Sequence, residues 1–142
     1  MEGHQMSVPT IGTLPARAHA TDAGADLKAA EYVVIPSQTR ALVHTGTSVQ
    51  LPAGTVGYIT PRSGLATKHG VTVLNAPGTI DAGYTGELAV VLHNTGRHPF
   101  EVHPGDRIAQ LVVQPVLLPE FTPVGGFADT DRGDGGFGST GV

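Results

Sequence analysis

Several segments of the sequence place charged or polar side chains among glycines, which is typical of binding loops. In the first of them, Asp22 and Asp26 flank the small residues Ala23-Gly24-Ala25 just before a predicted strand. Two interpretations are open. The carboxylates support an Asx turn, or they take part in a network that holds either magnesium with its waters or the catalytic water.

The second segment, Pro61-Arg62-Ser63-Gly64-Leu65, begins the one predicted helix. A guanidinium group, a hydroxyl and the free backbone N–H groups of a first helical turn are the components of a phosphate-binding loop. The alternative is a capped helix beside a solvated arginine.

The third segment, 75–87, carries an amide, an acid and an aromatic residue between glycines. We expect it to form a hairpin, in which alternate side chains point to one side, so that Asn75, Asp81 and Tyr84 converge on a small ligand. Asp81 would then serve as general base to a water molecule. The alternative is an aspartate that supports its own turn.

The fourth segment, 132–141, contains the spacing G-x-G-x-x-G at 133–138. No strand is predicted before these glycines and no helix after them, so a dinucleotide-binding turn is excluded. An arginine, an aromatic ring, two hydroxyls and many accessible N–H groups remain. Such a segment could wrap a polyphosphate while Phe137 stacks on a base.

A single polar residue, Gln110, lies in an otherwise apolar predicted strand and must find a partner. It is either a satisfied core amide or a ligand contact. The seven histidines show no metal-ligand spacing such as H-E-x-x-H.

The elements that must position these residues are short apolar runs separated by Gly and Pro. The predicted strands are 32–35, 40–51, 55–60, 71–74, 87–93, 100–103 and 107–118. In the fifth run, Leu88, Val90 and Leu92 share one face, the pattern of a half-buried strand. Many short strands and almost no helix predict an all-β sandwich, barrel or jelly roll.

Turn and cap residues add local predictions. Pro52-Ala53-Gly54 indicates a turn with proline at its second position, which would join 40–51 and 55–60 as a hairpin. Pro115 and Pro119 favour an edge or a crossover for the last strand. Ser63 is expected to cap the helix 64–69, with Lys68 and His69 in its last turn and Gly70 just beyond.

Length and composition limit the number of domains and the possible classes of function. A chain of 142 residues predicts one domain, with 1–124 as a barrel and 125–142 as a flexible glycine-rich arm. The net charge of −4 excludes a basic surface for nucleic acid, and no apolar run is long enough to span a membrane. The absence of cysteine excludes disulfides, thiolate zinc sites and cysteine catalysis, and it fits a cytoplasmic location. Only 14% of residues are charged, which suggests surface buried between subunits.

Taken in order, five segments resemble the five motifs of the homotrimeric deoxyuridine triphosphatases (dUTPases), and the resemblance covers about Ala20 to Gly141. The motifs are Asp22-Ala23-Gly24-Ala25-Asp26-Leu27, Pro61-Arg62-Ser63-Gly64, Gly78-Thr79-Ile80-Asp81-Ala82-Gly83-Tyr84, Gly105-Asp106-Arg107-Ile108-Ala109-Gln110 and Arg132-Gly133-Asp134-Gly135-Gly136-Phe137-Gly138.

The resemblance implies a jelly-roll-like β-barrel that forms a trimer with three active sites at subunit contacts. It implies hydrolysis of dUTP to dUMP and pyrophosphate, which keeps uracil out of DNA and supplies dUMP for dTTP synthesis. Mg²⁺ would be held by the triphosphate rather than by direct side-chain ligands, and Asp26 would reach it only through water.

The resemblance also assigns roles to residues. Asp81 matches the acid that deprotonates the attacking water, and Asp26 the carboxylate that supports the water and metal network. Tyr84 matches the aromatic residue that packs under the deoxyribose, and Phe137 the ring that stacks on uracil. The phosphate contacts would be Arg62, Ser63, Gly64, Gln110, Arg132, Ser139 and Thr140, and the uracil contacts Asn75, Gly78, Thr79 and Ile80. Gly138 would also bind the substrate.

Two other functions are alternatives. A deoxycytidine triphosphate deaminase shares the fold, but in that family a carboxylate follows the strand after the third motif, and 88–93 contains no acid. A trimeric binding protein that uses the nucleotide pocket as a switch would be expected to lack Asp81 or the arm. Both are present in this sequence.

Overall fold

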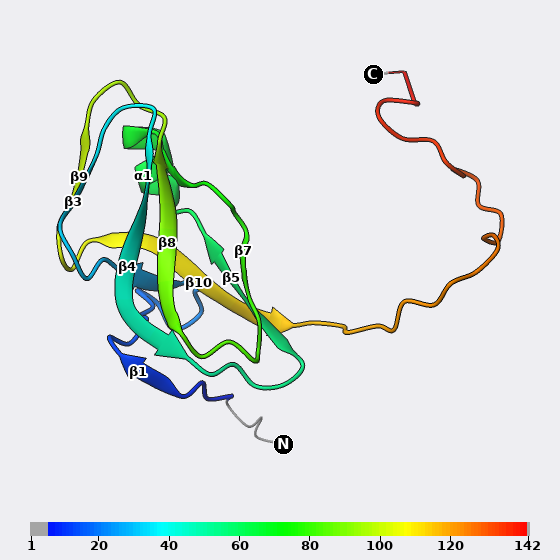
Figure 1. Ribbon diagram of the computed structural model, residues 1–142, viewed down its shortest axis with the longest axis horizontal. Helices are drawn as coiled ribbons and strands as arrows, with labels where there is room; N and C mark the ends of the chain where they lie inside the picture. The colour runs from blue at the N-terminus through cyan, green and yellow to red at the C-terminus, as the bar shows by residue number, and fades with distance from the viewer. Residues whose placement is uncertain (1–5, 142) are drawn as a thin grey trace.

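The protein, seen in a computed structural model, is built almost entirely from antiparallel strands (Figure 1). The structure describes residues 6–141, and residues 1–5 and 142 lie outside the description. The elements are β1 (Thr10–Gly12), β2 (Ala25–Lys28), β3 (Val33–Ile35), β4 (Arg40–Val49), β5 (Thr55–Thr60), α1 (Ser63–His69), β6 (Val71–Val73), β7 (Gly78–Ile80), β8 (Glu87–Asn94), β9 (Phe100–Val102) and β10 (Arg107–Pro115).

The strands form two four-stranded sheets and one two-stranded sheet. The first sheet has the order β1-β4-β8-β6, the second has the order β2-β10-β5-β7, and β3 pairs with β9. One apolar cluster joins the two larger sheets, because Val43 and Leu92 of the first lie in the same buried group as Leu27 and Ile59 of the second. The predicted all-β class is therefore confirmed.

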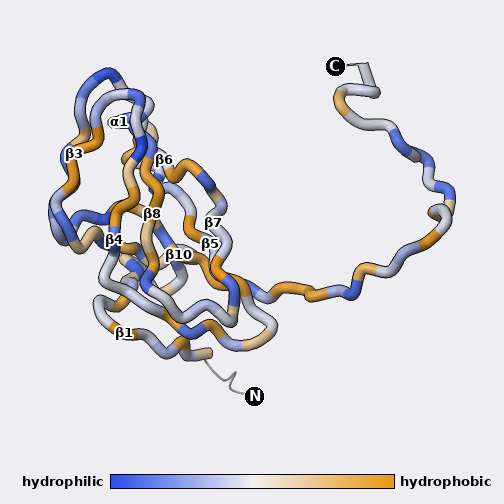
Figure 2. Tube along the Cα trace, viewed as in Figure 1, coloured by the Kyte–Doolittle hydropathy of each residue, from blue (hydrophilic) through white to orange (hydrophobic). Residues whose placement is uncertain are grey.

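Strand β8 shows why the apolar pattern was informative. Leu88, Val90 and Leu92 are buried and the residues between them are more exposed, which is the predicted alternation. Figure 2 shows hydrophobic stretches along the strands and hydrophilic residues in the connecting loops.

Both predicted hairpins are wrong. β4 pairs with β1 and β8, whereas β5 pairs with β10 and β7, so 50–54 carries the chain from one sheet to the other. Within 75–87, β7 pairs with β5, whereas β8, which begins at Glu87, pairs with β4 and β6. A change of sheet and a hairpin use the same Gly and Pro turn signals, so local sequence cannot separate them.

The turn at 52–54 is shifted by one position from the predicted turn. The Thr55 N–H donates to the Pro52 carbonyl at 3.1 Å, which makes Pro52 the first residue of the turn instead of the second. Gly54 has φ +81°, the left-handed conformation that the third position of such a turn requires.

The predicted edge position of the last strand is wrong as well. β10 lies between β2 and β5 in the second sheet. β2 pairs with β10 only as far as Leu111, and Pro115 lies beyond that point, opposite Thr55 of β5. The missing N–H of Pro115 therefore costs no ladder bond on the β2 side, and a proline is tolerated in a central strand.

Helix α1 confirms its C-terminal prediction but not its N-terminal one. Gly70 adopts φ +67° just past the last turn, which carries Lys68 and His69. Arg62, not Ser63, occupies the N-cap position, and no side chain caps the helix. Ser63 is the first helical residue, so its hydroxyl is not used to cap the backbone.

The C-terminal segment leaves the sheets after β10. The Val116 N–H still donates to the Gly54 carbonyl at 3.0 Å. Beyond that bond the chain runs away from the sheets in an extended path (Figure 1). No helix within residues 6–141 is long and apolar enough to cross a membrane.

Asn94 at the end of β8 organises the loops at one end of the molecule. Asn94 is fully buried. Its side-chain amide nitrogen donates to the carbonyls of Ile35 (2.9 Å) and His98 (2.8 Å), and its side-chain oxygen accepts from the Gly96 N–H (2.9 Å). These three bonds link the β3 end, the 95–99 loop and β8.

We predict that Asn94→Ala lowers the free energy of unfolding by about 1–3 kcal/mol, because it leaves buried carbonyl and amide groups without partners. Urea unfolding followed by circular dichroism measures the change. Gln114→Ala, an exposed position on β10, is the control and should change the stability by no more than about 0.5 kcal/mol. Equal loss in both variants would contradict the role of Asn94.

Candidate active site

Strand register brings the first, second and fourth motifs together. Asp26 on β2 lies opposite Gln110 on β10, and Gln110 lies opposite Thr60 on β5. The chain leaves β5 at Thr60 and begins α1 three residues later, so Arg62 lies at the same end of the sheet. Three segments distant in sequence therefore meet because the middle strand pairs with both neighbours.

Asp26 is the electrostatic centre of this region. Its carboxylate lies 3.4 Å from Arg62 Nε and 3.9 Å from Arg107 Nη1, and its side chain is only 18% exposed. Arg62 Nη1 donates to the Arg107 carbonyl at 3.2 Å. Both guanidinium groups lie at one carboxylate, and their remaining N–H groups are donors that an anionic ligand can use.

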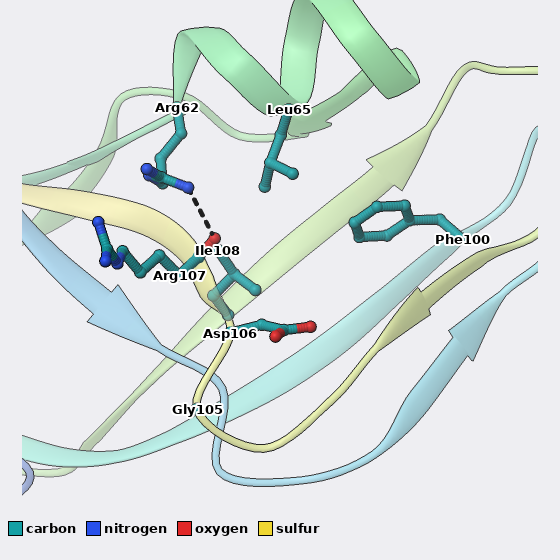
Figure 3. Close-up of a pocket in the computed structure, with 7 residues that line it drawn as sticks. All are labelled: Arg62, Leu65, Phe100, Gly105, Asp106, Arg107 and Ile108. Carbon is teal, nitrogen blue, oxygen red and sulfur yellow. Dashed lines mark hydrogen bonds between the residues drawn. The ribbon is translucent and has the colours of Figure 1, made fainter.

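These residues line an open groove with a volume of about 650 Å³, here called the anion groove. Its lining includes Asp26, Arg62, Ser63, Gly64, Arg107 and Gln110. Figure 3 shows an adjoining hollow, lined by both arginines together with Leu65 of α1 and Phe100 of β9. The volume suits a small polyphosphate-bearing molecule.

Arg107 is a member of the groove to which the sequence analysis assigned no role. The ladder between β2 and β10 shifts register between Arg107 and Ala109, so Ile108 is an extra residue. As a result Ile108 and Ala109 are both buried, although they are adjacent. The only available signal was the position of Arg107 three residues before Gln110, which does not reveal a bulge.

The two aspartates of the first motif have different contacts. Asp22 supports its own turn, because its Oδ2 accepts from the His19 N–H at 2.9 Å. Asp26 instead contacts the two arginines in the groove. The hydrogen bond of Asp22 runs to a residue three positions before it, so Asp22 supports the turn 19–22 without forming an Asx turn, and Asp26 is the acid that contacts the arginines of the groove.

Gln110 is held in place by a close fit to the first motif. Its amide nitrogen donates to the Pro61 carbonyl at 3.2 Å. A Cβ added to Gly24 would lie within 2.7 Å of the Gln110 Cδ, closer than real Cβ contacts allow. Gly24 is therefore needed for close approach, which explains a glycine between two acids.

The third motif forms a second, smaller cavity of about 260 Å³, here called the hairpin cavity because it is lined by the segment expected to be a hairpin. Thr79, Ile80, Asp81 and Tyr84 line it together with the start of β8. The Tyr84 N–H donates to the Asp81 carbonyl at 3.1 Å, so the backbone closes this turn. The carboxylate of Asp81 makes no hydrogen bond or ion pair with another of the described residues. Asn75 lies beside Gly78, whose added Cβ would be 3.5 Å from the Asn75 amide nitrogen.

The anion groove and the hairpin cavity lie at different ends of the second sheet. Ile80 is opposite Gly57, which places Asp81 level with Val56, and Gln110 is opposite Thr60. Thr60 is four residues beyond Val56, roughly 13 Å along the strand, and β7 is two strands from β10, about 10 Å across. One chain therefore does not bring Asp81 and Gln110 to the same phosphate group.

The residues of the fifth motif lie in neither cavity. Arg132 Nε donates to the Gly135 carbonyl, at 2.6 Å, within the arm itself. Phe137 is fully exposed. A large exposed aromatic ring and an arginine on an extended segment are suited to contact a site elsewhere, on this chain or another.

Fold and groove together define a class: an all-β protein with an arginine-lined groove beside a short helix. The particular family follows from sequence. This chain belongs to the dUTPase family, whose sequence model matches residues 11–141.

Individual relatives agree with that assignment. The chain is 51% identical over 138 residues to the deoxyuridine 5'-triphosphate nucleotidohydrolase of Leifsonia xyli subsp. xyli, which covers 96% of this chain and 91% of that protein. It is 55% identical over 134 residues to the enzyme of the same name from Mycobacterium marinum, and the match covers 90% of this chain and 87% of that protein.

Solved structures show the same fold. The dUTPase of Staphylococcus bacteriophage 80alpha with dUPNHPP superposes with a TM-score of 0.89 at 32% identity, covering 97% of this chain and all of the other. A mutant dUTPase of phage phi11 of S. aureus, in which a structural Mg(II) ion is coordinated, superposes with a TM-score of 0.80 at 29% identity. The match covers 86% of this chain and 99% of the other.

Proposed function

We propose that this protein is a dUTP diphosphatase that hydrolyses dUTP to dUMP and pyrophosphate, in the cytoplasm, thereby keeping uracil out of DNA and supplying dUMP for dTTP synthesis. The observation that carries the proposal is the convergence of Asp26, Arg62 and Gln110 in the anion groove. Membership of the dUTPase family supports the choice of substrate.

The anion groove binds the triphosphate. Arg62 supplies a planar fork of donors, Ser63 and Gly64 supply a hydroxyl and backbone N–H groups, and Gln110 supplies an amide. Arg107 adds a second cation, and its contact with Asp26 keeps its guanidinium group at the groove. Binding of a phosphate competes with Asp26 for both guanidinium groups.

The hairpin cavity binds the nucleoside and the attacking water. Asn75 and the backbone of Gly78, Thr79 and Ile80 contact the uracil edge. A base with swapped donor and acceptor positions, such as cytosine, leaves these groups unpaired, which makes rejection strong. Tyr84 packs under the deoxyribose and leaves no room for a 2′-hydroxyl.

Asp81 takes the proton of the attacking water. As the water oxygen bonds to the α-phosphorus, the bond from that phosphorus to the bridging oxygen breaks, and pyrophosphate leaves. Positioning of the water and neutralisation of the phosphate charge account for most of the acceleration in such reactions. The carboxylate of Asp81 is exposed and has no partner among residues 6–141, which fits a group that must accept a proton from water.

A complete site requires more than one chain, and we propose a homotrimer with three shared sites. The separation of Asp81 from Gln110 within one chain supports this, because both must reach the same triphosphate. In a closed ring every copy offers the same two surfaces, so each contact between neighbours forms one site. Residues 1–124 form the barrel, and 125–142 form an arm that closes a neighbour's site and brings Arg132, Phe137, Gly138, Ser139 and Thr140 to the substrate.

Mg²⁺ fits this arrangement as a partner of the triphosphate. It usually keeps several waters and binds substrate phosphates with one or two carboxylates, and the groove offers the carboxylate of Asp26. Asp26 would hold the ion through water. When bound, Mg²⁺ supplies charge neutralisation on the phosphate oxygens.

The decisive measurement is pyrophosphate release from dUTP and from each of the four common deoxynucleoside triphosphates, with ammonia measured in parallel. We expect rapid release from dUTP alone. Ammonia from dCTP would identify a deaminase, and binding of dUTP without product would identify a non-enzymatic binding protein.

Discrimination against the ribonucleotide gives a separate prediction. Because Tyr84 lines the cavity with Asp81, UTP should be a very poor substrate, and Tyr84→Ala should reduce the ratio of kcat/KM for dUTP to that for UTP by about tenfold or more. Steady-state kinetics on both nucleotides measures it. An unchanged ratio would remove Tyr84 from the sugar site.

A further inference from the structure

The Tyr84 side chain is folded back onto the two residues that begin β8. Its hydroxyl donates to the Glu87 carbonyl at 2.9 Å. A Cβ added to Gly86 would lie 2.7 Å from the ring carbon Cζ and 3.0 Å from Cε1, and still closer to the hydroxyl oxygen. The ring therefore rests directly on the Gly86 backbone, in space that no other residue type leaves open.

Glu87, whose carbonyl accepts this hydrogen bond, is held by both its backbone and its side chain. Glu87 pairs with Ser48 of β4 in the ladder. Its carboxylate accepts from His44 Nδ1 at 3.1 Å and from the Gly46 N–H at 3.3 Å, across the irregular part of β4. A group anchored through both backbone and side chain gives Tyr84 a fixed support, although Tyr84 itself is 44% exposed.

We infer that Gly86 is the positioning residue for sugar selectivity: by its lack of a side chain it lets the Tyr84 ring lie against the backbone, where the Glu87 carbonyl holds it. The inference rests on the proposed function, in which Tyr84 packs under the deoxyribose. A residue with any side chain at 86 displaces the ring, and the displaced ring no longer excludes a 2′-hydroxyl.

The chain offers a clean test. The backbone of Gly86 does not have a left-handed φ, so alanine is not strained there on that account, and the three atoms nearest to its Cβ all belong to the Tyr84 side chain. Gly83 lies in the same segment, also without a left-handed φ, and a Cβ there would have nothing within 4 Å. Gly83→Ala is therefore the matched control.

The experiment compares kcat/KM for dUTP and UTP in the full-length protein. We expect Gly86→Ala to lower the dUTP/UTP ratio by about tenfold or more and Gly83→Ala to leave it within about twofold. In a Tyr84→Ala background, Gly86→Ala should cause no further drop, because the ring it displaces is gone.

Two results would overturn the inference: an unchanged ratio in Gly86→Ala, or an equal drop with and without the Tyr84 ring. If Gly86→Ala does not fold, Tyr84→Phe decides, because it keeps the ring and removes the bond to Glu87. The ratio should fall in Tyr84→Phe, and an unchanged ratio would overturn the role of the support. Hydrolysis of dUTP by the unaltered protein tests the proposed function independently of either variant.

Discussion

Asp81→Asn is expected to bind dUTP with unchanged affinity and to lose about 10²–10⁴-fold in kcat. The amide keeps the shape of the side chain and can still hold a water molecule, but it cannot take the proton as the water attacks. Asp81 lines the hairpin cavity and makes no bond to other described residues, so the substitution disturbs no structural contact.

Titration with a non-hydrolysable dUTP analogue gives the affinity, and continuous pyrophosphate release gives kcat. Glu101→Gln is the matched control, because it neutralises an exposed carboxylate on β9 outside both cavities. A kcat for Asp81→Asn above about a tenth of the original would show that another group is the base.

Removal of the arm from Arg132 onward should have an effect of similar size. The truncated protein should remain a folded trimer that binds nucleotide weakly and hydrolyses it very slowly. The arm has little apolar content and no contact with the sheets in Figure 1, so its loss leaves the core intact. Its Arg132 and Phe137 are the groups expected to offset the entropy of ordering it over the triphosphate and uracil.

Size-exclusion chromatography and thermal unfolding check the first part, and binding and turnover check the second. Truncation after 138, which keeps Arg132 and Phe137 but removes the two hydroxyls of 139–140, should retain more activity than truncation at 131. Full activity after truncation at 131 would exclude the arm from the site.

The contribution of the arm to a neighbouring chain can be tested with mixed trimers. Asp81→Asn chains and arm-deleted chains, each inactive alone, are refolded together in equal amounts. If a site takes Asp81 from one chain and the arm from another, random mixing makes about a quarter of the sites competent. If the arm closes over Asp81 of its own chain, no competent site forms. No gain above the parent proteins would exclude the exchange and leave the chemistry in place.

Sequence alone was enough for the class of fold and for the candidate residues. Alternation on β8 follows directly from the two-residue period of a strand, and left-handed Gly70 follows from the geometry of a helix end. Such features depend on neighbours within a few positions along the chain. The motif residues could also be selected, because acids, amides and arginines among glycines are unusual outside binding loops.

Tertiary structure decided everything that depends on which strands pair. The turn at 52–54 and the segment 75–87 carry the signals of a hairpin, yet each leads to a different sheet, because core packing between the sheets outweighs local turn preference. Register, and not sequence distance, places Asp26 beside Gln110 and keeps Asp81 away from both. A β-bulge at Ile108, which a periodic sequence pattern does not predict, buries Ile108 in the core and leaves Arg107 beside Asp26. Long-range pairing has no local signature, since its energy comes from surfaces that meet only when the chain is folded.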